Sequence, residues 1–324
     1  MINCWNEGET LKQTLKKGLQ TGLETTWTLG KVIFPVTLIV SFLQHTPLID
    51  WMVHFITPVM KVIGLNGDAA IPLVIGNFLN LYAAIGAILS IDFTVKEVFI
   101  LAVMLSFSHN LLIETTVASK VGVKLWIILS VRLGLAFFSA FIINLFWDGG
   151  GEKAQYGFIS QQDAVPSDWG MILLEGLEKA AMGVIQLAAI VIPLMIAIQF
   201  MKDLGWVDAF SKKMEPVTEM LGMKRNTSTT LAAGLIFGLA YGAGVMLQAV
   251  KEDGVEHRDL TLAFIFLVAC HAVIEDTLIF VPIVGSVWPL LLIRLFAAIL
   301  LTMIIGFVWK KQAHIGKRGT VYEH

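Results

Sequence analysis

Two apolar stretches of the sequence each carry a histidine that is followed by carboxylates. The first reads Ser108-His109-Asn110 and continues to Glu114-Thr115-Thr116, and the second reads Cys270-His271-Ala272 and continues to Glu275-Asp276-Thr277. Ionisable side chains inside apolar segments are costly, so they usually face a cavity or a partner and mark a functional site. Histidine, whose ordinary pKa is about 6.5, can also take up a proton near neutral pH. These stretches are therefore the first candidates for a site.

The spacing within each stretch predicts a different geometry. His271 and Glu275 are four residues apart and would share one face of a straight helix. His109 and Glu114 are five residues apart and would point away from each other, so their convergence requires a broken helix. Three interpretations stay open: a solute- or ion-binding centre, a metal site for which His271 and Glu275 are the candidates, and buried hydrogen bonds that only satisfy one another.

The amide side chains of Asn77, Asn80 and Gln248 lie in neighbouring apolar spans. Amides donate and accept hydrogen bonds, so they suit a neutral polar solute, although they also bond helix to helix. Arg132 and Arg294 each stand in an apolar span, and we expect them to bind a carboxylate across the interface of the two halves rather than reach to the membrane surface. The candidate binding residues are His109, Asn110, Glu114, Thr115, His271, Glu275, Asp276, Thr277, Asn77, Asn80 and Gln248, with Arg132 and Arg294 as structural ion pairs.

The composition places these residues in a membrane protein. Of 324 residues, 56% are apolar and 15% are charged. The stretches 125–146, 180–200 and 290–308 approach or reach the roughly 20 apolar residues that cross about 30 Å of hydrocarbon. The sequence shows no basic stripe for a nucleic acid polymer and no nucleophile–base arrangement of an enzyme. We expect a multi-pass protein of the cell (cytoplasmic) membrane that is not an enzyme and needs no cofactor.

An internal duplication organises the spans. The matched positions lie 158 residues apart in the first part of the repeat and 162 apart after a four-residue insertion near residues 252–258. Apolar composition alone does not explain matched proline, tryptophan, histidine and arginine in the same order. The matches include Gly18 with Gly176, Pro35 with Pro193, Gly76 with Gly234, His109 with His271, Glu114 with Asp276, Arg132 with Arg294 and Trp147 with Trp309.

Lysine and arginine near the ends of the spans predict the orientation. Basic residues place the N-terminus, residues 120–124, residues 212–225 and the C-terminus inside, and the linker between the repeats outside. The first repeat thus begins inside and ends outside, and the second does the reverse. Inverted repeats are typical of transporters, whose site lies where the repeats meet. The predicted segments are a cytoplasmic N-terminus (1–17), a first repeat (18–147), a polar external linker (148–175), a second repeat (176–309) and a basic cytoplasmic tail (310–324).

This orientation requires an odd number of crossings in each repeat. The segments Trp51–Leu65 and Trp206–Met223 mix charged and apolar residues and are predicted to be amphipathic helices that lie in the membrane interface. If they do, the glycine-rich span (76–90; 234–250) or the histidine span must be re-entrant or broken into half-helices. Three crossings plus a hairpin, and five crossings, both fit.

The glycine-rich and histidine spans resemble the nucleoside-recognition or Gate-domain membrane proteins. The stretches concerned are Gly76-Asn77-Phe78-Leu79-Asn80, Ser108-His109-Asn110 with Glu114-Thr115-Thr116, and His271 with Glu275-Asp276-Thr277. The resemblance covers nearly the whole chain and implies relatives among concentrative nucleoside transporters, ferrous-iron transporter membrane domains and spore-maturation membrane proteins. Unlike the iron transporters, the sequence has no GTPase domain, and it is shorter than the nucleoside transporters.

We therefore expect an all-α membrane protein of two inverted-topology Gate-like repeats, with interfacial amphipathic helices and broken or re-entrant helices. The favoured function is a secondary transporter that moves a small polar, nucleoside-like solute by alternating access, coupled to a proton or another cation. A metal-ion carrier or channel is one alternative, and a non-transporting membrane scaffold or signalling partner is another. The expected partners are a small polar solute or ion and the lipid bilayer, with no nucleic acid polymer, and a homo-oligomer stays open.

Overall fold

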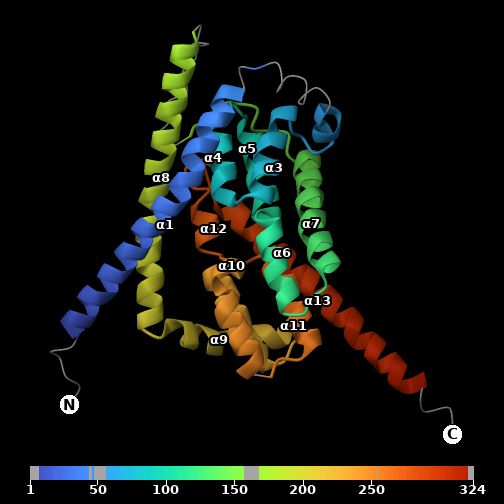
Figure 1. Ribbon diagram of the computed structural model, residues 1–324. Coiled ribbons are helices and arrows are strands. Elements are labelled where there is room, and N and C mark those ends of the chain that lie inside the picture. The colour runs from blue at the N-terminus through green and yellow to red at the C-terminus, as the bar shows by residue number, and fades with distance from the viewer. Residues whose placement is uncertain (1–6, 44–45, 47–55, 157–167, 253, 320–324) are drawn as a thin grey trace. The chain divides into compact units, whose positions relative to one another are not determined.

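The computed structural model describes residues 7–43, 46, 56–156, 168–252 and 254–319, without the side chains of 7–10, 207–208, 240–245, 247–252 and 311–319. The described residues are almost entirely helical (Figure 1). A bent pair, Ile56–Val62 with Gly67–Phe78, meets at 90° and would add one span to the five single candidates in the described residues. Those five are Leu11–Leu43, Val95–Lys120, Leu125–Phe146, Trp169–Asp203 and Trp288–Lys310, by length and composition.

The chain forms two compact units, and each draws on both halves of the sequence. The units therefore differ from the sequence repeats, because each unit contains segments of both repeats. The first unit comprises Met1–Leu112, Leu133–Gly205 and Ile274–Leu290, and the second comprises Ile113–Arg132, Trp206–Val273 and Leu291–His324.

In the first unit, the opening helices of the two repeats, α1 (Glu7–Leu43) and α8 (Trp169–Asp203), pack along each other (Figure 1). A Cβ added at Gly18 would lie 2.7 Å from the Cα atom of Ile196, and a Cβ added at the matched Gly176 would lie 3.1 Å from Leu38. Residue numbers thus rise along α1 where they fall along α8, so the helices are antiparallel. Since Leu38 and Ile196 are themselves matched, exchanging the repeats reproduces the same contact, which confirms the inverted duplication.

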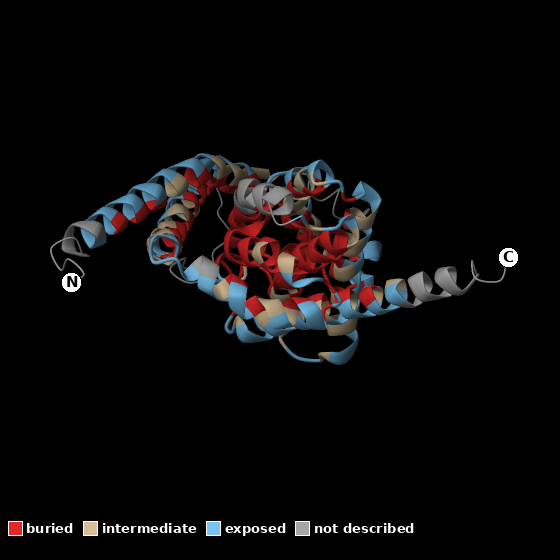
Figure 2. Cartoon of the chain, turned by 90° about the horizontal axis from the view of Figure 1, so that it is seen from below, coloured by how far each residue is buried: buried red, intermediate tan, exposed pale blue. Residues whose placement is uncertain are grey.

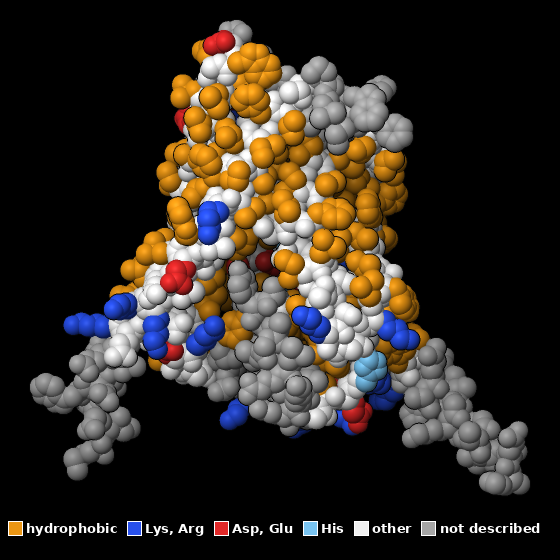
Figure 3. Space-filling model, viewed as in Figure 1, with side chains coloured by type: hydrophobic (Ala, Val, Ile, Leu, Met, Phe, Trp, Pro, Cys, Tyr) orange, Lys and Arg blue, Asp and Glu red, His pale blue; other side chains and the backbone are white. Residues whose placement is uncertain are grey.

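The outer and inner helices of the first unit differ in burial. Along α1, buried and exposed residues alternate (Figure 2). Every residue of α4 (Leu81–Ser90) is buried, and most of α5 (Val95–Ser108) is buried as well. Hydrophobic side chains cover the outward faces of α1 and α8, while charged side chains gather around the N-terminal part of α1 (Figure 3). This distribution fits helices that meet lipid on one side and protein on the other.

The glycine-rich spans are broken at matched positions. In the first repeat, α3 (Ala70–Phe78) ends before α4 begins, and the extended Asn80 caps α4 by accepting a 2.8 Å hydrogen bond from Ala83 N. In the second repeat, α10 (Ser228–Glu252) has a non-helical Gly238 with φ 75° and ψ 178°, a conformation that glycine adopts without strain. Glycine also permits close packing in this span, because a Cβ at Gly234 would lie 2.5 Å from Leu267.

The histidine spans are also broken, as predicted. α5 ends before α6 (Leu111–Lys120), and α11 (His257–Ala269) ends before the short α12 (Glu275–Leu278). Asn110 (φ 57°) and Ala272 (φ 41°) are the non-glycine residues with positive φ in the described chain, and they occupy matched positions. Asn110 N donates to Gly76 O over 2.8 Å, and Ala272 N donates to Gly234 O over 3.1 Å. At each break, the matched backbone amide thus makes the same hydrogen bond to the glycine-rich span.

In the second unit, α9 (Trp206–Met220) is an amphipathic helix, as predicted. Its residues Ser211, Met214 and Thr218 are buried, whereas Lys212 and Lys213 are exposed. In the first repeat, the described part of the corresponding segment forms the helix Ile56–Val62, and residues 51–55 lie outside the described residues. The remaining elements are η1 (Gly67–Ala69), α7 (Leu125–Phe146), η2 (Arg225–Thr227) and α13 (Trp288–Gly319).

The packing of α1 on α8 predicts that Gly18→Ala lowers the free energy of unfolding by about 1–3 kcal/mol, because the added methyl group meets backbone that cannot move aside. Gly134→Ala in α7 is the matched control, since a Cβ there meets nothing within 4 Å. Both changes gain the same helix propensity. Unfolding of the purified chain in detergent measures the difference, and equal stability of the two variants would contradict this packing.

Candidate functional site

His109 lies at the C-terminal end of α5 in the first unit and is 4% exposed. Its Nδ1 atom lies 2.7 Å from Leu105 O. A carbonyl oxygen can only accept, so this hydrogen bond places the ring hydrogen on Nδ1. The other ring nitrogen, Nε2, lies 3.9 Å from Asp276 Oδ2 on α12. The geometry therefore presents Nε2, and not Nδ1, to the carboxylate.

A second carboxylate of α12 also has a partner in the first unit. The Tyr82 hydroxyl on α4 donates to the carboxylate of Glu275, and both residues are buried. α12 thus brings two acidic side chains to residues of the first repeat, one to the end of α5 and one to α4.

His271, in the second unit, repeats the environment of His109. Its Nδ1 atom lies 2.7 Å from Leu267 O, and its Nε2 atom lies 3.2 Å from Glu114 Oε1. The other Glu114 oxygen lies 2.7 Å from an Arg132 nitrogen in a fully buried ion pair. Arg294 donates to His271 O over 2.8 Å. All four side chains are buried, and they include ionisable groups of both signs.

The two histidine–carboxylate pairs are related by the duplication. His109 matches His271, and Glu114 matches Asp276. His109 nevertheless faces Asp276, and His271 faces Glu114, so each histidine faces the carboxylate of the other repeat. Within each compact unit, one histidine–carboxylate contact therefore joins the two repeats.

One prediction about these residues is wrong. His271 and Glu275 do not share a helical face, because α11 ends at Ala269 and α12 begins only at Glu275. Each side chain of the proposed metal pair has another contact, Glu275 with Tyr82 and His271 with Glu114, and the metal site itself stays a prediction.

Both arginines make buried contacts with the histidine spans. Arg132 pairs with Glu114 of its own repeat, and Arg294 donates to His271 O of its own repeat. The helix breaks explain this result, because they bring the chain on either side of each break within reach of the next span. Both arginines have no exposed surface, which excludes side chains that extend to the membrane surface.

The other candidates contribute unequally. Asn80 serves as a helix cap, and Asn77 Nδ2 donates to Leu73 O over 2.7 Å. The Gln248 side chain lies outside the described residues. Within the described part of the chain, four buried oxygen atoms of the uncharged candidates have no hydrogen-bond partner: Asn77 Oδ1, Asn110 Oδ1, Thr115 Oγ1 and Thr277 Oγ1.

Tyr82 is the residue that was absent from the predicted set. It is one of only four tyrosines in the chain, and it lies two residues after Asn80 in an otherwise apolar span. A buried phenolic hydroxyl needs a hydrogen-bond partner, so a tyrosine in this span indicates a further polar group nearby.

The arrangement of His271 requires a proton in the contact with Glu114. With Nδ1 bound to a carbonyl, a neutral ring would direct the lone pair of Nε2 at a carboxylate oxygen. Only a shared proton makes that contact attractive. The guanidinium of Arg132 lies 2.7 Å from the other oxygen of the same carboxylate.

The buried ion pair predicts that Arg132→Met lowers the free energy of unfolding by about 3–5 kcal/mol, because it leaves the Glu114 carboxylate buried without its guanidinium partner. Arg132→Met with Glu114→Gln recovers part of this loss. Arg225→Met is the control, since Arg225 pairs with Glu219 in an exposed ion pair and its loss leaves stability nearly unchanged. Unfolding in detergent measures all three, and equal effects of the two single changes would contradict the assignment.

Comparison with known proteins agrees with the fold. The model of the family described as "Gate: Nucleoside recognition" matches residues 26–124 and 184–287, and these regions begin 158 positions apart, the offset of the duplication. The chain is 64% identical over 301 residues to the "Uncharacterized membrane protein YvoD" of Bacillus subtilis (strain 168), covering 93% of this chain and 96% of that protein. No solved structure matches. The chain is therefore a membrane protein that belongs to the Gate (nucleoside recognition) family, with one Gate region in each of its two repeats.

Proposed function

We propose that the chain is a secondary transporter of the cell membrane, with both termini in the cytoplasm, that moves a small polar solute together with a proton by alternating access. The observation that carries the proposal is the pair of histidines at the helix breaks. In both repeats Nδ1 is fixed by a carbonyl at 2.7 Å, so Nε2 faces a buried carboxylate. Membership of the Gate family supports a transporter-like role. The proposal includes no catalytic step.

The unpaired polar atoms favour transport over a purely structural role. A membrane scaffold would be expected to satisfy its buried polar groups internally. Instead, Asn110 follows His109 and Thr277 follows Asp276, and each has a buried oxygen without a partner in the described chain. Oxygen atoms of amides and hydroxyls accept hydrogen bonds from a polar solute or from the water that replaces it.

The helix breaks supply a structural basis for alternating access. A continuous helix moves as one rod, whereas a break lets its halves tilt separately. Breaks occur at Asn110 and Ala272 and again at Asn80 and Gly238, always at positions that match between repeats. Loss of the proton from His271 would turn the attraction to Glu114 into a repulsion between lone pairs. We propose that this change drives the half-helices between their two arrangements.

Uptake into proteoliposomes tests the proposal. The solute panel begins with nucleosides, since the family is described by nucleoside recognition, and adds nucleobases, amino acids, small sugars and divalent metal ions. We expect uptake of at least one solute that is stimulated by an inward proton gradient and abolished by a protonophore.

His271→Gln should remove the stimulation by the proton gradient, because glutamine keeps the size and hydrogen bonding of the side chain but cannot carry the proton. His257→Gln is the matched control, since it makes the same change at an exposed residue at the start of α11, the helix that precedes His271. Uptake of a metal ion without any solute would replace the proposal by a metal carrier. Absence of uptake by the folded protein for every panel member would reject transport.

A further inference from the structure

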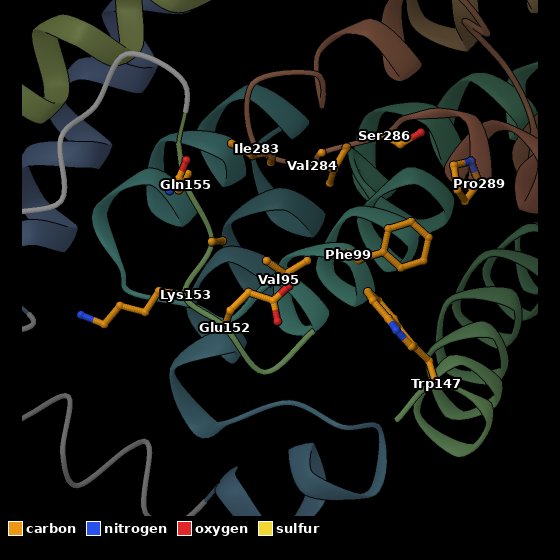
Figure 4. A pocket seen from close by; sticks show the side chains of 12 residues that line it. Val95, Phe99, Trp147, Glu152, Lys153, Gln155, Ile283, Val284, Ser286 and Pro289 are labelled. Atoms are coloured by element: carbon orange, nitrogen blue, oxygen red, sulfur yellow. The ribbon is translucent and has the colours of Figure 1, made fainter. Parts of the chain in front are cut away.

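A pocket of about 640 Å³ lies in the first unit, away from the histidine contacts (Figure 4). Three segments form its walls: the start of α5, residues 147–155 after α7, and residues 283–289 after α12. The volume falls in the range of pockets that bind small molecules. His109 caps the opposite end of α5, and Asp276 lies in α12, just before residues 283–289.

The wall formed by the linker is held firmly in place. Val95 N donates to Glu152 O over 2.9 Å, and Ala154 N donates to Phe93 O over the same distance. The Tyr156 hydroxyl donates to Ile91 O over 2.9 Å and accepts from Phe93 N over 3.2 Å. Burial raises the pKa of Tyr156 well above its usual range, so the hydroxyl keeps its proton and remains a donor. These hydrogen bonds hold residues 152–156 against the start of α5, so this wall of the pocket does not need a ligand to form.

Aromatic rings and a single acidic group define the chemistry of the pocket. Phe99 and Trp147 pack edge to face, with ring centroids 5.5 Å apart at an angle of 87°. Glu152 and Lys153 leave the linker in opposite directions, Glu152 toward the aromatic rings and Lys153 away from them (Figure 4). Lys153 also pairs with Asp92 over 3.4 Å, which offsets its charge. The carboxylate of Glu152 has no partner among the described residues.

We propose that this pocket is a second binding site, specific for small organic ammonium compounds, alkylated ones above all. Ring faces attract cations, and a nearby carboxylate adds charge complementarity, which is the combination that recognises alkylated ammonium groups. Ile283 and Val284 form a buried apolar wall that suits the methyl groups of such a cation. An anion would meet Glu152, and a neutral apolar molecule would leave the carboxylate unused. The proposal does not depend on transport.

Choline and its uncharged isostere 3,3-dimethylbutan-1-ol test the site, because they share one shape and differ in charge. Saturation-transfer NMR on the purified full chain in detergent follows the methyl signal of each probe over a concentration series. We expect saturable binding of choline and binding of the isostere that is weaker by about fivefold or more.

Glu152→Gln should remove this preference and weaken choline binding about fivefold, because it deletes the charge and keeps the backbone hydrogen bond to Val95. Lys153→Gln is the matched control, since it changes the neighbouring residue whose side chain points away, and it should leave the preference intact. Trp147→Leu should weaken choline more than the isostere.

The proposal is overturned if choline does not bind saturably, if both probes bind equally to the unaltered protein, or if Glu152→Gln binds choline as the unaltered protein does. Glu152 is exposed, so its variant tests the site even where Trp147→Leu fails to fold. Binding is measured without a gradient, so failed uptake and failed binding are separate outcomes.

Discussion

A backbone amide that a helix break frees in a membrane must find another acceptor, because lipid offers none. The structure meets this constraint in the same way in both repeats. Asn110 N bonds to Gly76 O, and Ala272 N bonds to Gly234 O, so the end of each histidine span is tied to the glycine-rich span of the same repeat. Glycine fits there, since a Cβ at Gly76 or Gly234 would make Leu105 or Leu267 shift.

The remaining polar contacts depend on these breaks. Because α5 and α11 end just before their histidines, each imidazole can turn back and bond to a carbonyl four residues earlier, at Leu105 or Leu267. That bond fixes the tautomer and leaves Nε2 for the carboxylate. The buried charge of Glu114 then needs Arg132, and its partnership with His271 needs a proton. A geometry that begins with one backbone hydrogen bond thus leads to the proposed proton-binding site.

Much of the fold could be predicted from the sequence. Matched proline, glycine and histidine residues revealed the duplication, the basic residues predicted its inversion, and the antiparallel packing of α1 on α8 confirmed it. The five-residue spacing of His109 and Glu114 correctly indicated a broken helix. The pairing of residues could not be predicted, because it depends on where each chain turns after its break. Helical periodicity therefore failed for His271 and Glu275, which lie on either side of an irregular segment, and Tyr82 was missed since its partner is 193 residues away.

The central claim is that His271 holds a proton toward Glu114, and nitrogen NMR of the histidine-labelled protein tests it most directly. The spectrum of His271→Gln identifies the signals of His271 by their absence. The account predicts that both ring nitrogens of His271 carry hydrogen at neutral pH and that Nε2 loses it when Glu114→Gln removes the charge it faces. A His271 ring with a bare Nε2 in the unaltered protein at neutral pH would contradict the account.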